Sequence, residues 1–141
     1  MKRVVLLSFL LWCCLGLLSA QEGLHIDRVF GKYAVRENAV EVSMTGKPLK
    51  DYRLSQFHSL EVRHPQPHDI DYIERQLADD VAKATVHEEG RQGERLLYGF
   101  YELPSAKQHT YIFYRHTPEK VTLIFLQGRA TVEEMKTFFK K

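Results

Sequence analysis

Cysteine is scarce in this 141-residue sequence, because both of its cysteines, Cys13 and Cys14, lie within the first fourteen residues. If the start of the chain is removed on export, no disulfide can stabilise the remainder and no cysteine nucleophile is left. The sequence also lacks a Gly-x-Ser-x-Gly nucleophile elbow, a glycine-rich phosphate loop and a His-Glu-x-x-His zinc motif. These absences exclude the most recognisable hydrolase and metalloprotease signatures, and we assign no catalytic residue.

An excess of charge of one sign is also missing. Of the 20 basic residues, Lys2 and Arg3 belong to the first twenty residues, which leaves 18 basic residues against 18 acidic ones. A neutral chain lacks the field that draws proteins onto nucleic acids or anionic membranes. We therefore expect no nucleic-acid partner.

Only one long hydrophobic run is present, residues 4–18, and it follows Lys2 and Arg3 and precedes the small pair Ser19 and Ala20. This order is typical of a secretory signal peptide, so we predict that residues 1–20 direct export to the periplasm or beyond and are cleaved. The run of about 15 residues is shorter than the roughly 20 that a spanning helix needs, so no integral membrane segment is expected in the mature chain. Lipidation fits poorly, because more apolar sequence follows the cysteines.

Residues 21–141 have the length of one ordinary domain, which can bury a core without disulfides. Residues 24–33 carry apolar side chains at helical spacing and predict a short helix. Residues 39–45 alternate between apolar and polar side chains and predict a half-buried strand, and residues 59–63 suggest a second. The two prolines that follow, at positions 65 and 67, end that strand.

A second helix is predicted over residues 70–84, with Asp69 as its capping residue. Residues 86–93 are polar and contain two glycines, so they are interpreted as a loop in which His87, Glu88 and Glu89 are solvated. The apolar stripe of the helix repeats at three to four residues and consists of Ile70, Ile73, Leu77, Val81 and Ala84.

Three strands are predicted in close succession over residues 94–103, 109–116 and 120–127, and their short connections require antiparallel pairing. Thr131 and Glu134 form a capping box that opens a final helix. We predict a single α+β domain with about five mostly antiparallel strands and with helices packed on one face. The apolar face of the final helix comprises Val132, Met135, Phe138 and Phe139.

Blocks of apolar and aromatic residues give the chain a resemblance to a known family. They are residues 97–104, 111–115, 121–128 and 130–135, with a further similarity over residues 54–60. In these blocks the sequence resembles an uncharacterised family of small exported Bacteroidales proteins, classed as a domain of unknown function. The resemblance implies an exported location in a Gram-negative cell, and it implies no activity, ligand or site residue.

Histidine is the one overused residue type, and His64 and His68 lie close to Asp69. Imidazole and carboxylate groups are zinc ligands, so these three residues are weak candidates for a metal site. The prolines at 65 and 67 prevent the helical spacing that would aim both rings at one ion. A solvated turn is therefore the favoured interpretation, and we predict no cofactor.

Aromatic residues are concentrated on the predicted meander, and side chains alternate along a strand, so they cannot all face one layer of helices. Aromatic rings on an open sheet face commonly bind ligands. The alternative is that a further layer or a loop buries both sets. The candidate ligand-binding residues are Tyr98, Phe100, Tyr101, Tyr111 and Tyr114.

Three classes of function remain compatible with the sequence. A non-enzymatic binding module of the cell envelope, or a secreted one, is favoured, and its partner would be an unknown protein or small ligand of the envelope. A small exported enzyme, either a hydrolase or a metal-dependent one, is the first alternative. A structural or assembly protein of the envelope is the second.

Export with cleavage can be tested directly. We expect mass spectrometry of protein recovered from cells to find a mature N-terminus near Gln21, because the apolar run and the small residues at 19 and 20 suit a signal peptidase. An intact Met1, or a lipid attached to Cys13 or Cys14, would contradict this prediction.

Overall fold

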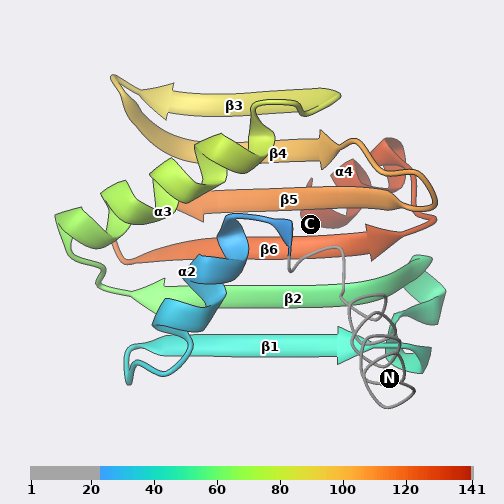
Figure 1. The fold of residues 1–141 in the computed structure, drawn as a ribbon, viewed down its shortest axis with the longest axis horizontal. Helices are drawn as coiled ribbons and strands as arrows, with labels where there is room; N and C mark the ends of the chain where they lie inside the picture. Colours follow the sequence, from blue (N-terminus) through green and yellow to red (C-terminus); the bar gives the residue numbers. More distant parts are fainter. Residues whose placement is uncertain (1–22, 141) are drawn as a thin grey trace, which may run out of the picture.

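The computed structural model describes residues 23–140, and the predicted signal peptide lies outside them. Figure 1 shows one sheet crossed by helices. In chain order the elements are α2 (Ile26–Tyr33), β1 (Ala39–Thr45), the 3-10 helix η2 (Lys47–Tyr52), β2 (Leu54–Arg63), α3 (Pro67–Val81), β3 (Val86–Gln92), β4 (Arg95–Leu103), β5 (His109–His116), β6 (Lys120–Gly128) and α4 (Val132–Lys140). No helix among the described residues is long and apolar enough to span a membrane.

The described strands form a six-stranded sheet in the order β1-β2-β6-β5-β4-β3, and every neighbouring pair is antiparallel. The α+β class and the antiparallel meander are confirmed, but the expected number of about five strands is wrong. The additional strand is β3, which occupies the region interpreted as a loop. The strand predicted from residue 59 also begins earlier, at Leu54.

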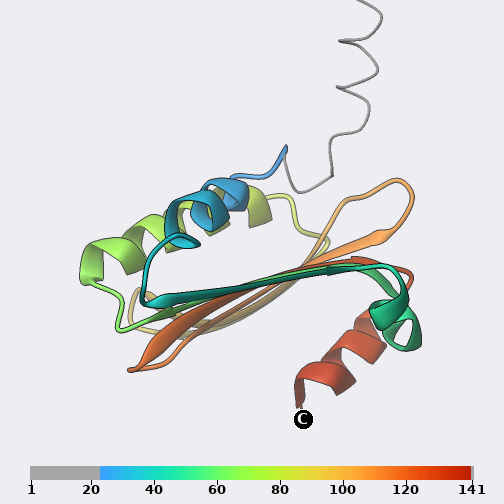
Figure 2. The same ribbon diagram turned by 90° about the horizontal axis from the view of Figure 1, so that it is seen from below.

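Helices cover both faces of the sheet, so the prediction of helices on one face is wrong. Figure 2 shows α2 and α3 on one side and η2 and α4 on the other. The first core lies under α2 and α3, and its largest fully buried members are Tyr33, Tyr101, Tyr114, Phe125, Ile26, Leu60, Ile73, Leu77, Ile112 and Leu123. The second core lies under η2 and α4 and comprises Leu49, Leu54, Phe100, Tyr111, Phe113, Leu126, Ala130 and Met135.

The central strands require this double cover because their apolar side chains alternate across the sheet. On β4, Phe100 joins the second core while Tyr101 joins the first. On β5, Tyr111 and Phe113 face the second core while Ile112 faces the first. Burying each such side chain contributes about 1.5–3 kcal/mol, so exposing either face would be costly.

Asp69 joins α2 to α3 through a buried polar cluster, and it is only 2% exposed. Its carboxylate accepts hydrogen bonds from the Tyr33 hydroxyl at 3.0 Å, from Arg36 Nη1 at 3.1 Å and from the Gln66 backbone N–H at 3.0 Å. Asp69 is therefore at the N3 position of a capping box whose N-cap is Gln66, so its prediction as the N-cap was wrong. The helix begins at Pro67, three residues before the predicted start, since proline is well tolerated in a first helical turn.

These donors change the acidity of Asp69. Burial acts to raise the pKa of its carboxyl, but the hydrogen bonds from Gln66 and Tyr33 and the charge of Arg36 lower it below the usual value. The folded protein therefore favours the ionised form.

Helix α4 packs through Met135, which is 1% exposed, and through Phe139, whose ring stacks on Phe113 at 4.3 Å between centroids. Phe138, placed on the apolar face by the sequence pattern, is 39% exposed and contacts the ring edge of Tyr52. Its assignment to the core is therefore wrong. Phe138 and Phe139 are successive residues of the helix and therefore point in different directions, so only Phe139 packs against the sheet.

Replacing Asp69 by asparagine should lower the free energy of unfolding by about 2 kcal/mol at pH 7, because charge-assisted hydrogen bonds are lost. A carboxyl with a lowered folded pKa stabilises above its unfolded pKa of about 3.9, and this contribution is lost as the pH falls below it. Urea unfolding at pH 7 and pH 3 should thus show the gap between wild type and Asp69→Asn shrinking in acid. The exposed Asp79→Asn on the same helix is the control. A gap of equal size at both pH values would refute the assignment.

The packing of α4 gives a second prediction. Met135→Ala should lower the free energy of unfolding by about 2–5 kcal/mol, whereas Phe138→Ala should cost about 1 kcal/mol or less. Chemical denaturation of the two variants provides the comparison. An equal loss of unfolding free energy in both variants would contradict the assignment of Met135 to the buried side of α4.

Candidate functional site

The aromatic residues predicted to bind a ligand do not form one surface. Phe100 and Tyr111 lie in the second core, Tyr101 and Tyr114 lie in the first, and none of these four is more than 1% exposed. Tyr98 reaches the surface, with 37% of its area exposed. The sequence also allowed the alternative that both aromatic sets are buried, and four of the five candidate residues are indeed buried.

Tyr98 lines a groove of about 700 Å³ between α4 and strands β4 and β5. Its ring packs edge-on against Phe113, with 5.5 Å between centroids. A salt bridge of 2.6 Å between Lys136 and Glu88 also lines the groove. The other polar residues that line this groove lie at the end of β5 and in the loop that follows it. The groove therefore offers one exposed aromatic ring, that of Tyr98, and not a surface of several rings.

Of the three metal candidates, the structure brings two together: His68 Nε2 lies 3.3 Å from Asp69 Oδ1. Asp69 is occupied by the donors from Tyr33, Arg36 and Gln66, while the side chain of His68 is 76% exposed. His64 is exposed and adopts a positive φ of 50° at the end of β2. Among the described residues, no group of three or more ligand-type side chains is arranged to hold a metal ion.

A different site lies between helix α3 and the hairpin of β3 and β4, and we term it the α3–β3 groove. It has a volume of about 490 Å³. Its floor is apolar and is formed by Leu77, Val81 and Leu96. Its rim is polar and includes Asp71, Glu74 and Arg75 from the helix and His87, Glu89 and Arg91 from the hairpin, while Tyr101 lines it from the buried side.

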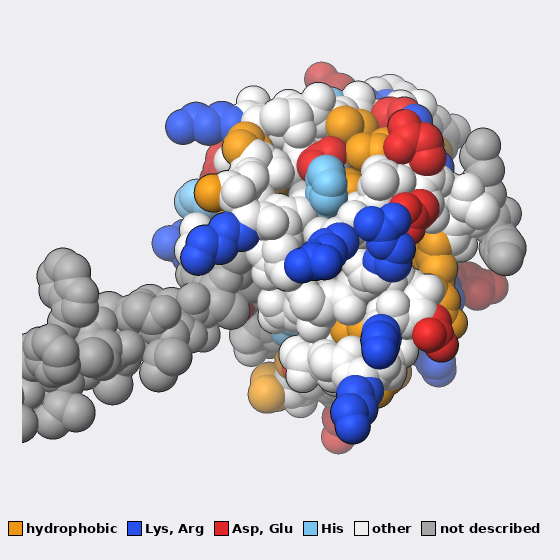
Figure 3. Space-filling view, turned by 90° about the vertical axis from the view of Figure 1, so that its right-hand side faces the viewer, with side chains coloured by type: hydrophobic (Ala, Val, Ile, Leu, Met, Phe, Trp, Pro, Cys, Tyr) orange, Lys and Arg blue, Asp and Glu red, His pale blue; other side chains and the backbone are white. Residues whose placement is uncertain are grey.

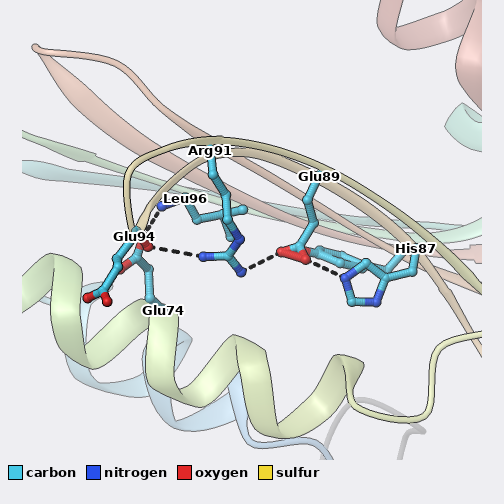
Figure 4. A network of polar contacts seen from close by, with 7 residues as sticks. Glu74, His87, Glu89, Arg91, Glu94 and Leu96 are labelled. Carbon is cyan, nitrogen blue, oxygen red and sulfur yellow. Dashed lines mark hydrogen bonds and ion pairs between the residues drawn. The ribbon is translucent and has the colours of Figure 1, made fainter.

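The β3 side of the groove is a row of polar side chains at alternate positions. His87, Glu89 and Arg91 are two residues apart, so they project from the same face of the strand. Figure 4 shows the Glu89 carboxylate between Arg91 and His87, with α3 running alongside. Arg91 Nη2 donates to Glu89 Oε2 at 2.7 Å, and the His87 ring contacts Glu89 Oε1. Arg91 Nη1 also donates to the carbonyl of Glu94 in the turn at 3.1 Å.

Tyr101 supplies a third partner for Glu89 from the neighbouring strand. Its hydroxyl donates to Glu89 Oε2 at 3.1 Å, and the His87 ring packs edge-on against its ring at 4.9 Å. The tyrosine ring lies back over Gly99, where an added Cβ would be 2.4 Å from the hydroxyl oxygen. Glycine at position 99, which pairs with Glu89, is therefore what admits the ring.

Salt bridges fix the α3 wall to the same hairpin. Glu74 Oε1 accepts the backbone N–H of Leu96 at 2.8 Å, and its Oε2 accepts Arg95 Nη1 at 2.9 Å. Arg95 also donates to Asp71 at 3.0 Å. The helix and the hairpin are thus tied together at one end of the groove.

The electrostatics of the groove favour a charged Glu89 and a neutral Tyr101. Burial acts to raise the pKa of Glu89, but hydrogen bonds from His87 and Tyr101 and the charge of Arg91 lower it below the ordinary value. Burial first, and then the charge of Glu89, raise the pKa of Tyr101. A carboxylate that already accepts three hydrogen bonds is a poor proton acceptor.

Sequence reasoning missed this site because residues 86–93 were interpreted as a loop. The signal that could have revealed it is the alternation of His87, Glu89 and Arg91 before Gly93, which has a φ of 62° and forms the hairpin turn. Because β3 carries polar residues on both of its faces, the strand shows no alternation of apolar and polar side chains, which is the usual sign of a strand.

Comparisons with known proteins place the chain in a family. No curated protein and no solved structure matches it. The model of a family of unknown function, DUF6108, matches residues 13–139, which is most of the chain. The resemblance to an uncharacterised family is thereby supported, and the chain belongs to the DUF6108 family of unknown function.

Proposed function

We propose that this protein is an exported, non-enzymatic binding module of the cell envelope, and that the α3–β3 groove receives its ligand. The predicted signal peptide and the resemblance to exported Bacteroidales proteins support the location. The groove supports the binding role, because it combines an apolar floor with convergent polar groups.

The observation that carries the proposal is the organisation of the Glu89 network. Glu89 has a side chain only 20% exposed and is held by His87, Arg91 and Tyr101. Ordering and partly desolvating such a cluster brings little net stability, because desolvation offsets much of the Coulomb attraction. A rigid polar cluster of this kind is what a binding site requires, since the ligand then meets groups that are already oriented.

The exposed groups indicate a peptide as the ligand. Arg91 and His87 keep side-chain exposures of 48% and 46%, and Arg75 lines the helix side, so the rim presents hydrogen-bond donors beside the acceptor carboxylates of Asp71 and Glu74. The floor can accept an apolar side chain. Tyr101 is 0% exposed, so the groove offers no tyrosine ring face on which a sugar could stack. An extended polypeptide segment, with carbonyl or carboxylate oxygens along the rim, satisfies both surfaces.

Filling the groove tests this function. Ala78 is an exposed residue of α3 that lines the groove, so Ala78→Trp should block the ligand without disturbing either core. Peptides selected from a phage-displayed library on the immobilised wild-type protein should bind this variant at least tenfold more weakly, while its melting temperature stays unchanged. Val35→Trp, at a position 86% exposed in the loop between α2 and β1, is the matched control and should bind as wild type does.

The same selection can refute the proposal. Selected peptides that bind Ala78→Trp as tightly as wild type would place their site elsewhere. A library that yields no enrichment over a blank surface would argue against peptide binding altogether.

A further inference from the structure

We propose that the end of the sheet beside η2 carries a second site, which binds a phosphate group. Its cationic residues are Lys50 of η2, Arg53 at the entrance to β2, and Arg129 after β6, and we term the space between them the basic groove. The groove has a volume of about 330 Å³. Figure 3 faces this end of the molecule and shows Lys and Arg side chains gathered across its middle.

The backbone brings Arg53 and Arg129 together. The carbonyl of Arg53 accepts the N–H groups of Arg129 at 2.9 Å and of Ala130 at 3.0 Å. Gly128 allows this approach, because a Cβ there would lie 2.6 Å from the Arg53 carbonyl oxygen and from Leu54 Cα. The two arginines are therefore fixed by main-chain contacts.

Arg53 also occupies a backbone conformation that side chains rarely adopt. Its φ is 57°, in the left-handed region, where it ends the 3-10 helix. Glycine or asparagine would be the ordinary choice at such a position. Such outliers concentrate at functional sites, where surrounding contacts hold them in place.

The charge of the groove is unbalanced. No carboxylate is among its lining residues. Within residues 23–140, neither Lys50 nor Arg129 forms an ion pair, while Arg53 pairs at 2.5 Å with Glu134 on α4. Two free cations thus converge in a protein whose acidic and basic residues otherwise nearly balance.

Neutral groups complete a site suited to an oxyanion. The Ser55 hydroxyl lies 3.0 Å from Gln108 Oε1, and both residues line the groove, so a hydroxyl and an amide stand beside the cations. A guanidinium fork, an ammonium group and an amide are the donors that bind a tetrahedral phosphate. A carboxylate has only two oxygens and would accept hydrogen bonds from fewer of these donors.

A titration with inorganic phosphate tests the site. Backbone amide resonances of Arg53, Gly128 and Arg129 should shift, with ionic strength held constant by sodium chloride. The double variant Lys50→Gln/Arg129→Gln should bind phosphate at least tenfold more weakly and should melt as wild type does in chloride, since both side chains are exposed. Arg28→Gln removes one charge from an exposed position on α2, at the opposite face of the sheet, and should not alter binding.

Phosphate can reach this site free or as a lipid headgroup, and vesicles distinguish the two. Cosedimentation with phosphatidylglycerol vesicles that millimolar phosphate displaces would assign a headgroup, and binding of free phosphate without cosedimentation would assign a soluble phosphate compound. Unchanged affinity in the double variant, shifts confined to other residues, or vesicle binding that phosphate does not displace would overturn the proposal.

Discussion

The constraint on which the structure depends is that strands β4, β5 and β6 carry apolar side chains on both faces. Tyr101 and Phe100 are neighbours in sequence, yet they belong to different cores. A sheet of this kind is stable only between two layers, so α2 and α3 must cover one face and η2 and α4 the other. Asp69 fixes the first pair of helices to each other, and Met135 anchors α4 to the second face.

The candidate binding surface arises where that cover ends. β3 is an outer strand of the sheet, and polar side chains occupy its positions facing the helices. Helix α3 lies over the inner strands (Figure 1). The α3–β3 groove is lined by residues of this helix and of the hairpin. Glu89 stands in that groove with His87, Arg91 and Tyr101 around it. The floor of the groove and Tyr101 belong to the first core, whereas His87, Glu89 and Arg91 lie outside both cores.

Local patterns predicted the elements well and their assembly less well. The strands Ala39–Thr45 and His109–His116 were expected with the bounds observed. The prediction that the first is half-buried was wrong, because β1 is an edge strand on which Val40 and Val42 are 46% and 40% exposed. The side of the sheet taken by α4 depends on contacts between distant segments, such as the hydrogen bond from the Tyr111 hydroxyl to the Ala130 carbonyl. The polar edge strand β3 was missed because an outer strand needs no apolar face. The groove could not be predicted without that strand.

The central claim is that the Glu89 network serves binding, while the two cores provide the stability. The most direct test is the free energy of unfolding of a variant in which His87, Glu89 and Arg91 are replaced by threonine, a residue that suits an edge strand, and Tyr101 by phenylalanine, so that no buried hydroxyl loses its acceptor. Urea denaturation should give a value within about 1 kcal/mol of wild type, because an ion-pair cluster brings little net stability. A loss of several kcal/mol would show that the network is a structural element of the fold and would contradict the account.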